Sequence, residues 1–185
     1  MRLMTIAALL AITVAAEGLL AQVQTAQTKS VSNTLQLTSS AFGPGAPIPD
    51  QYACKGADQS PEFRWSGAPQ VSMTFAMVMH DPDAPVGDWV HWVAWNIPSG
   101  EHALAADFPK DSELSNGTRQ GRNSFGKIGY NGPCPPPGKP HRYFFRIYAV
   151  DAKLDLGSGT TRGQLDAALK GHILAEAEYM GIYRR

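Results

Sequence analysis

The feature that most limits the fold is a stretch in which a rigid loop runs directly into a strand. Residues 130–140, YNGPCPPPGKP, contain five prolines, which remove backbone hydrogen-bond donors and fix φ. Two glycines in the same segment allow conformations that other residues avoid. Residues 141–150, HRYFFRIYAV, are rich in aromatic and β-branched residues and predict a buried strand. We therefore expect a stiff loop at the entrance of a core strand.

The alternation of a strand decides which side chains of this segment lie together. Successive side chains point to opposite faces, so His141 and Tyr143 share a face with Phe145 and Ile147, and Arg142 points the other way. A polar pair above apolar residues on one face is a common way to build the floor of a pocket.

A second stretch has the same design. A strand expected over residues 72–80 runs into Asp81-Pro82-Asp83-Ala84-Pro85, and an apolar run over 90–97 begins beside His91. Strand alternation places His91 on the face of Val93 and Trp95. Both stretches thus put a histidine at a strand entrance beside a loop made rigid by proline.

Composition limits the fold class and the partners. A chain of 185 residues, 43% of them hydrophobic, can form one domain with a sizeable core. Sixteen basic and sixteen acidic residues leave no net charge, and no basic run is present, which argues against nucleic acid as the main partner. The many glycines and prolines between short apolar runs favour a mainly β protein with long structured loops.

The N-terminus has the pattern of a secretory signal peptide, which we assign to residues 1–21. Arg2 precedes an uncharged apolar run, and small residues at Ala16 and Ala21 offer two cleavage points. The run is shorter than the roughly 20 residues of a membrane span, so we expect no stable span; an uncleaved membrane anchor is the alternative. Residues 22–32 read as a flexible leader and 33–185 as the folded domain. These features predict a periplasmic or secreted protein.

The two cysteines, Cys54 and Cys134, have two open interpretations. In an oxidising compartment they could form one disulfide, closing a loop of about 80 residues; otherwise they are free thiols. Their spacing fits neither a redox motif nor a zinc knuckle.

Shorter elements are expected elsewhere. The sequence predicts short strands over 34–39, 62–65 and 103–108, and a surface loop over 111–121. Thr161 and Gln164 fit a capping box, and Gly171 fits the position that ends a helix. Residues 173–178 alternate as a strand does but are rich in Ala and Glu, so we expect the closing strand only near 179–183.

The polar residues of the two main stretches suggest a small anion receptor. Two histidines that can each carry a proton, His91 and His141, would be joined by the phenol of Tyr143. Asp81 would accept a proton from one imidazole and so fix its tautomer. Free N–H groups near Gly132 and Pro133 would add donors, and Asp83 lies in the same turn as Asp81.

Three other interpretations compete with an anion pocket. The histidines could be structural residues satisfied within the sheet. A zinc or iron site is disfavoured because the Asp-Pro-Asp unit is rigid and no closely spaced histidine pair occurs. A hydrolase with Ser124 as nucleophile lacks a Gly-x-Ser-x-Gly motif and an indicated base.

Together these motifs resemble the signature of the phosphatidylethanolamine-binding protein family. The motifs are Asp81 to Pro85, His91-Trp92, Gly132-Pro133 and His141-Arg142-Tyr143, and they occur in the family's order. Residues 129–136 and 171–175 resemble its bacterial Raf-kinase-inhibitor-like branch. The resemblance covers residues 35–185.

The resemblance implies a β-sandwich of antiparallel sheets with one peripheral α-helix. It also implies an anion pocket lined by Asp81, His91, the Gly132 region, His141 and Tyr143, with Pro85 and Trp89 near the rim. The expected function is binding of phosphate-type or phospholipid head-group ligands, without catalysis, cofactor or metal. An inhibitor or modulator that docks on a kinase or protease is the alternative, and a hydrolase is the third.

Overall fold

The computed structural model describes residues 34–185, and the predicted signal peptide and leader lie outside this range. The strands are β1 (Gln36–Thr38), β2 (Phe63–Ser66), β3 (Thr74–Asp81), β4 (Trp89–Pro98), β5 (Ala103–Leu104), β6 (Arg119–Gln120), β7 (His141–Val150) and β8 (Ile173–Tyr183). They are joined by a short 3₁₀ helix, η1 (Asp50–Tyr52), and by α1 (Arg162–Leu169). The mainly β class with one α-helix in the described chain confirms the predicted fold.

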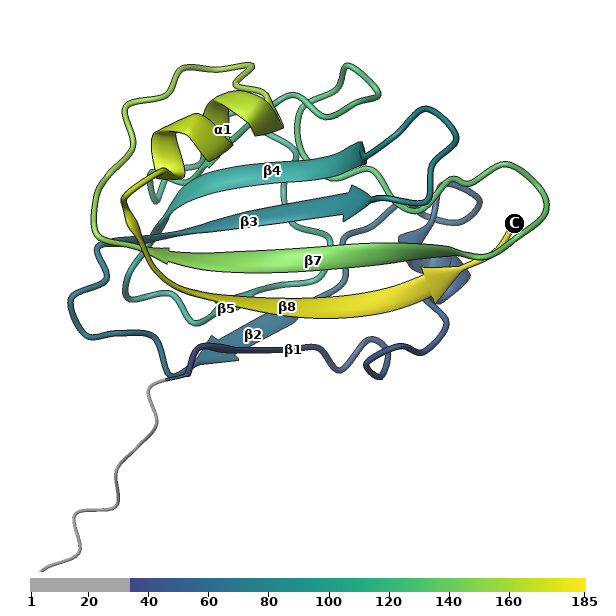
Figure 1. The fold of residues 1–185 in the computed structure, drawn as a ribbon, viewed down its shortest axis with the longest axis horizontal. Coiled ribbons are helices and arrows are strands. Elements are labelled where there is room, and N and C mark those ends of the chain that lie inside the picture. The colour runs from purple at the N-terminus through teal and green to yellow at the C-terminus, as the bar shows by residue number, and fades with distance from the viewer. Residues whose placement is uncertain (1–33) are drawn as a thin grey trace, which may run out of the picture. The chain divides into compact units, whose positions relative to one another are not determined.

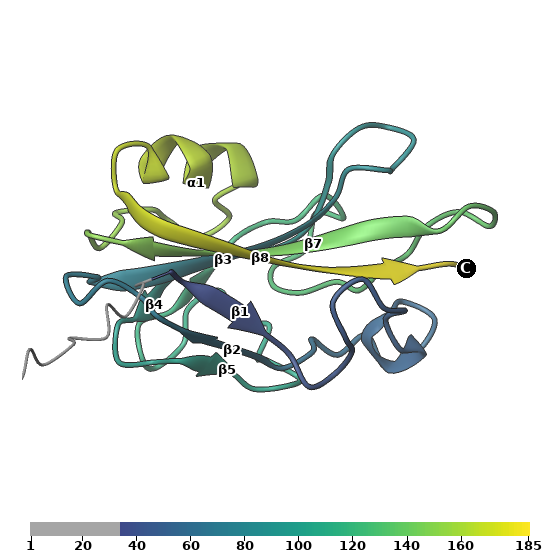
Figure 2. The same cartoon turned by 60° about the horizontal axis from the view of Figure 1, so that its bottom comes forward.

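Two antiparallel sheets pack face to face. The larger has the order β6-β4-β3-β7-β8 and the smaller the order β1-β2-β5. Figure 1 shows the large sheet face-on, and Figure 2 shows the small sheet below it and α1 above it. The large sheet therefore buries one face against the small sheet. Its other face is partly covered by α1.

The core between the sheets is aromatic. Phe63 of β2 packs on Phe145 of β7 with ring centroids 4.5 Å apart, and Trp65 packs on Phe75 at 5.2 Å. On the opposite face of the large sheet, Trp95 belongs to a second buried cluster that includes residues of α1. Burial on both faces explains why the central strands read as nearly continuous apolar runs.

Strand β7 has the bounds predicted for it, but β8 is longer than expected. It pairs with β7 from Val150↔Ile173 to His141↔Tyr183, with one register shift at its beginning. The strand prediction for 179–183 was therefore too short. Cross-strand pairing and packing of Ala175 and Ala177 on the core override the helical preference of Ala and Glu.

The predicted surface loop over 111–121 also contains a strand. Arg119 and Gln120 form β6, which pairs with Trp95 and Ala94 of β4. Gln120 is completely buried and accepts a hydrogen bond from Trp92 Nε1 at 2.7 Å. The polar composition of residues 111–121 suggested an exposed loop. Instead, the buried Gln120 side chain forms hydrogen bonds with groups outside β6, so its polar atoms are satisfied without water.

The capping prediction for α1 is confirmed. The Thr161 backbone N–H donates to Gln164 Oε1 at 2.9 Å, which forms half of the capping box. Gly171 has φ of 87°, the left-handed conformation that commonly follows a helix end. Among residues 34–185, no helix has the length and hydropathy needed to cross a bilayer.

Candidate ligand-binding site

A pocket lies at one end of the large sheet, where the loops before β4 and β7 come together. Figure 1 shows both loops at this end, near the C-terminus. The cavity has a volume of about 240 Å³. It is lined by Asp81, Ala84, Pro85, Val86, Trp89, His91, Phe125, Cys134, Pro135, Pro136 and His141.

Three adjacent strands carry the polar residues into this pocket. Asp81 ends β3, His91 lies near the start of β4, and His141 opens β7. Because β3 pairs antiparallel with both neighbours, its end lies beside their beginnings. All three side chains are less than 10% exposed. The structure therefore brings together residues that the sequence separates, and their role in ligand binding stays a prediction.

A β-bulge decides which way His91 points. Met79 pairs with Trp92 and His80 with Val90, so His91 is an extra residue in β4. Its ring packs edge-on against Tyr143 with centroids 5.2 Å apart, on the face of the inter-sheet core. The prediction that His91 shares a face with Val93 and Trp95 was wrong, because a bulge interrupts the alternation on which it depended.

Asp81 holds His141 in one tautomer. Nδ1 of His141 lies 2.8 Å from Oδ2 of Asp81, so this nitrogen donates and Nε2 is left for the pocket. The other carboxylate oxygen, Oδ1, accepts the backbone N–H of Asp83 at 2.9 Å. This is the arrangement that the sequence predicted for Asp81 and one imidazole.

His91 is held by backbone carbonyls instead of a carboxylate. Its Nδ1 lies 2.8 Å from the carbonyl oxygen of Asn131 and 3.1 Å from that of Gly132. Nδ1 therefore carries a hydrogen, and Nε2 is the nitrogen left for the pocket. Burial lowers the pKa of His91 below its ordinary value of 6.5, despite the opposing effects of the hydrogen bond to the Asn131 carbonyl and of the Asp81 carboxylate.

Gly132 has a structural role that differs from the predicted one. Its N–H donates to Asp58 Oδ1 at 2.6 Å, so it offers no free donor to a ligand. A Cβ at this position would lie 2.1 Å from the carbonyl oxygen of Tyr52, which explains the requirement for glycine. The carbonyl of Pro133 accepts the N–H of Cys54 at 3.1 Å. Neither Gly132 nor Pro133 lines the cavity, and their role in ligand binding stays a prediction.

Asp58 is a residue that the sequence did not reveal. Besides Gly132 N–H, its carboxylate accepts Asn131 Nδ2 at 3.2 Å and pairs with Lys110 Nζ at 2.9 Å. Asp58 thereby holds the two residues whose carbonyls fix His91. It lies in a polar loop with no motif, so no local signal could have found it.

Tyr143 lies beneath the pocket and does not line it. Its side chain is completely buried, and its hydroxyl has no hydrogen bond of acceptable geometry to any residue in the described chain. Burial, reinforced by the nearby Asp81 carboxylate, raises the pKa of this phenol well above its ordinary range. The hydroxyl therefore keeps its hydrogen and can act as a hydrogen-bond donor.

Asp83 points away from the cavity, contrary to the site prediction. It accepts the backbone N–H and the guanidinium of Arg142, at 2.9 Å from Nε and 2.7 Å from Nη2. The Arg142 hydrogen bond lowers the pKa of Asp83 to about 2. It lines a neighbouring hollow with Lys139, so its role is to fix the turn against β7.

The wall of the pocket is fastened by a disulfide between Cys54 and Cys134, whose Cα atoms lie 5.4 Å apart. Of the two interpretations left open by the sequence, the structure has the bonded one. Cys134 itself lines the cavity. The predicted rim residues Pro85 and Trp89 also line it, and Trp89 packs edge-on against Phe125 at 5.4 Å.

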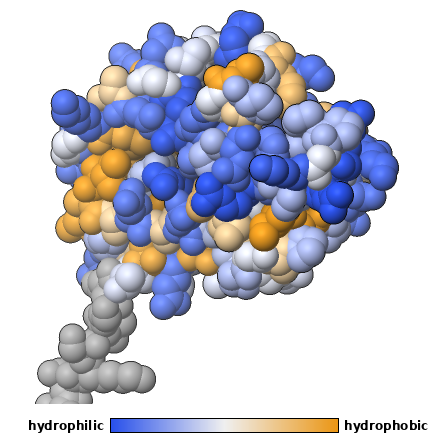
Figure 3. All heavy atoms as spheres, turned by 45° about the vertical axis from the view of Figure 1, so that its right-hand side comes forward, coloured by the Kyte–Doolittle hydropathy of each residue, from blue (hydrophilic) through white to orange (hydrophobic). Residues whose placement is uncertain are grey.

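The outer surface at this end is mixed. Figure 3 turns it toward the viewer and shows mostly hydrophilic surface interrupted by separate hydrophobic groups. Val86 at the pocket mouth is 76% exposed and Phe125 is 37% exposed. No sequence pattern singled out either residue as part of the cavity.

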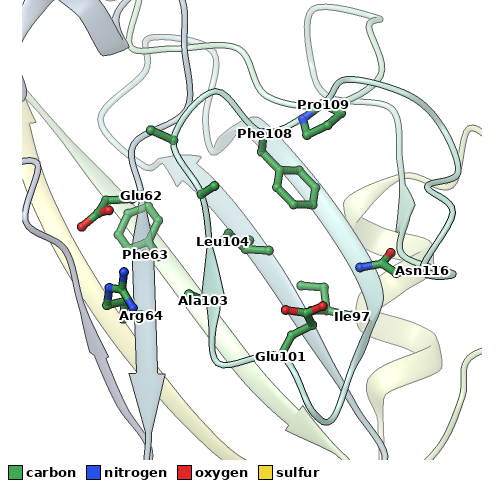
Figure 4. A pocket seen from close by; sticks show the side chains of 12 residues that line it. Glu62, Phe63, Arg64, Ile97, Glu101, Ala103, Leu104, Phe108, Pro109 and Asn116 are labelled. Atoms are coloured by element: carbon green, nitrogen blue, oxygen red, sulfur yellow. The ribbon is translucent and has the colours of Figure 1, made fainter.

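A larger hollow of about 440 Å³ lies over the small sheet, away from the histidines. Figure 4 shows Glu62 and Arg64 on one side of β5 and Phe108 on the other. No histidine lines this hollow in the described part of the chain. We therefore take the smaller, histidine-lined pocket as the candidate functional site. Within residues 34–185, no three His, Cys, Asp or Glu side chains form a group that could hold a metal ion.

An antiparallel β-sandwich with a histidine-lined pocket at its strand ends defines a binding protein of the phosphatidylethanolamine-binding type. The sequence profile described as phosphatidylethanolamine-binding protein matches residues 38–184, and the chain belongs to this family.

Relatives from distant organisms support this assignment. The chain is 43% identical over 153 residues to a UPF0098 protein of Aquifex aeolicus, covering 82% of this chain and 89% of that one. It is 43% identical over 151 residues to a UPF0098 protein of Methanothermobacter thermautotrophicus, covering 82% and 99%.

Two solved structures are similar to this fold. One is a Chlamydia trachomatis protein described as a phosphatidylethanolamine-binding protein homologue, with a TM-score of 0.75, 40% identity and coverage of 83% of this chain and 99% of that one. The other is Escherichia coli YbcL, described as a new member of the mammalian family, with a TM-score of 0.77, 34% identity and coverage of 82% and 98%.

Proposed function

We propose that this chain is a non-catalytic binding protein whose pocket takes a phosphate-type anion, either free or as part of a phospholipid head group. One observation carries the proposal. Asp81, His91 and His141 come from three strands and line one small cavity while nearly excluded from solvent. Burying three titratable groups is costly unless they have partners or a task, and such clusters are typical of functional sites.

The hydrogen bonds within the protein leave suitable groups for a ligand. In both histidines Nδ1 is engaged, by Asp81 in one case and by backbone carbonyls in the other, which leaves each Nε2 for the cavity. Tyr143 adds a buried hydroxyl without a partner in the described residues. When an imidazole is protonated, its Nε2 donates to an anionic oxygen and its charge attracts the anion.

Binding without turnover is supported by the state of Ser124, the serine that lies close to the site in sequence. Ser124 Oγ accepts the N–H of Val90 at 2.9 Å, and no hydrogen bond joins it to either pocket histidine within residues 34–185. A nucleophilic serine needs a base within hydrogen-bond reach. Phosphorus NMR of phosphoethanolamine incubated with the protein tests this point, and release of inorganic phosphate would contradict it.

Calorimetry with phosphate and phosphoethanolamine at about pH 6, within the histidine range, tests binding directly. The wild-type protein should bind, and His141→Gln should weaken binding by about tenfold or more, because a charge-assisted hydrogen bond is lost. His172→Gln is the matched control, since His172 pairs with Asp151 outside the pocket. Absence of binding by the wild-type protein, or equal affinity in both variants, would refute the proposal.

We further propose that the protein acts in the periplasm or outside the cell. The signal-like residues 1–21 and the Cys54–Cys134 disulfide support this, because such bonds persist in oxidising compartments. Mass spectrometry of the protein from a periplasmic fraction, with the N-terminus cleaved near Ala21, is the test. Recovery of an uncleaved chain in the cytoplasm would contradict it.

A further inference from the structure

We propose that the pocket recognises a hydrogen atom on its ligand: at neutral pH it selects an oxyanion that still carries a proton, such as phosphate, over one that carries none, such as sulfate. The inference rests on the proposed function, because it concerns the same pocket. It adds the chemical feature by which ligands of nearly equal shape and size are distinguished.

The carbonyls around His91 fix the direction of hydrogen bonding. A carbonyl oxygen only accepts, so the contacts of Nδ1 with Asn131 and Gly132 require the hydrogen on Nδ1. In the neutral ring Nε2 is then an acceptor and cannot donate. Asp58 strengthens this arrangement by holding Asn131 Nδ2 and Gly132 N–H, which keeps both carbonyls in place.

The charged and titratable groups facing His91 come from four parts of the chain. Asp81 ends β3, His141 and Tyr143 belong to β7, and Asp58 lies in the loop behind Gly132, where Lys110 pairs with it. The hydrogen bond to the Asn131 carbonyl and the two carboxylates favour a charged imidazole, but burial has the larger effect on the pKa and favours the neutral ring. At neutral pH the ring therefore presents a lone pair to the cavity.

The carboxylate nearest to the two histidines cannot replace that missing donor, because it only accepts hydrogen bonds. Asp81 lines the cavity as a carboxylate whose oxygens already accept from His141 and from the Asp83 N–H. A ligand oxygen without hydrogen would face the His91 lone pair and this negative charge together. One hydrogen must therefore lie between His91 Nε2 and the ligand, supplied by the imidazolium at low pH and by the ligand at neutral pH.

Selectivity follows from where that hydrogen comes from. Inorganic phosphate carries at least one hydroxyl throughout the range from about pH 5 to 8, because its middle pKa only changes the number of hydroxyls from two to one. Sulfate carries none, and neither does a phosphate diester. Sites built around a ligand hydrogen reject analogues that lack it far more strongly than sites that read shape alone.

The test is calorimetry with inorganic phosphate, sulfate and dimethyl phosphate at about pH 7.5 and pH 5, on either side of the ordinary histidine value. We expect phosphate to bind the wild-type protein at least about tenfold more tightly than sulfate or dimethyl phosphate at the higher pH. As pH falls, the preference over sulfate should shrink once His91 becomes protonated, because its Nε2 can then donate. The diester represents the linkage of a phospholipid head group and the free ion represents a soluble phosphate.

A variant separates selectivity from general damage. His91→Gln replaces the fixed acceptor with an amide that can rotate to donate, so the preference for phosphate over sulfate at neutral pH should fall below about threefold. His172→Gln provides the control and should keep the wild-type preference. Nitrogen NMR of the histidine rings gives a readout without any ligand, and His91 should show its hydrogen on Nδ1.

The outcomes distinguish this inference from the proposed function. Equal affinity for phosphate and sulfate at neutral pH, or a hydrogen on Nε2 of neutral His91, overturns the inference and leaves an anion pocket in place. Binding of dimethyl phosphate as tight as that of phosphate also overturns it, and would identify the diester as the preferred class. Failure of all three anions to bind at either pH overturns both.

Discussion

Replacing Gly132 with alanine tests how the pocket wall is built. The added Cβ would lie 2.1 Å from the Tyr52 carbonyl oxygen, 2.8 Å from Ala53 Cα and 2.9 Å from Tyr52 carbonyl carbon. All three are backbone atoms, so no side chain can rotate away to relieve the contact. The Tyr52 oxygen also accepts the hydroxyl of Tyr130 at 2.6 Å, which fixes it further.

The cost can be estimated from that geometry. Normal carbon contacts begin near 3.4 Å, so the two segments must separate by about 1 Å, and overpacking of this kind costs about 1–3 kcal/mol. We expect Gly132→Ala to lie at the upper end, at about 3 kcal/mol. For a domain of this size that loss corresponds to a fall in Tm of roughly 6–12 °C.

The assay is urea unfolding followed by tryptophan fluorescence, with the disulfide intact. Gly157→Ala is the matched control, because no atom lies within 4 Å of its added Cβ and its φ is outside the left-handed range. We expect that control to change the unfolding free energy by less than about 0.5 kcal/mol. Equal stability of the two variants would refute the close-packing account of Gly132. Displacing the Gly132 carbonyl should also weaken phosphate binding, because it removes a partner of His91 Nδ1.

Two further predictions concern the loops around the pocket. Replacing Cys54 and Cys134 together with serine should lower the unfolding free energy by about 2–5 kcal/mol, because the bond restricts the unfolded chain; thermal unfolding measures this, and a loss below about 1 kcal/mol would contradict it. Arg142 lowers the folded-state pKa of Asp83 to about 2, whereas the pKa in the unfolded chain is about 3.9. The pair therefore stabilises the fold fully above about pH 3.9, and this contribution is lost as pH falls through about 2. Because the pair is partly exposed, Asp83→Asn should cost less than about 1 kcal/mol at neutral pH and flatten the stability curve between about pH 4 and 2; an unchanged curve in unfolding experiments across that range would refute the assignment.

The large elements could be predicted because their signals are local. Residues 141–150 form β7 with the predicted bounds, since dense aromatic and β-branched residues favour a strand whatever its partner is. The helix could be placed by Thr161, Gln164 and Gly171, because capping depends on residues within a few positions of each other. The ends of strand β8 could not be predicted in this way. Its Ala and Glu residues are extended because they pair with β7, and that pairing is not visible in the local sequence.

The site could be predicted only in part. That Asp81, His91 and His141 lie together could be predicted, because each ends or opens a strand beside a proline-rich loop. Asp83 and Gly132 were expected in the pocket but do not line the cavity. The carboxylate of Asp83 accepts hydrogen bonds from Arg142, and the N–H of Gly132 donates to Asp58. Both partners are distant in sequence, so these hydrogen bonds could not be predicted.

The sequence by itself determined the β-rich class, the positions of the main strands and the residues that mark the family. Periodicity and proline chemistry act over a few residues, so they can be read without knowing what packs against them. Only the tertiary structure decided that His91 faces the cavity and which of its nitrogens carries the hydrogen. Both depend on a bulge opposite β3 and on carbonyls held by Asp58, and such contacts exist only after distant segments have packed together.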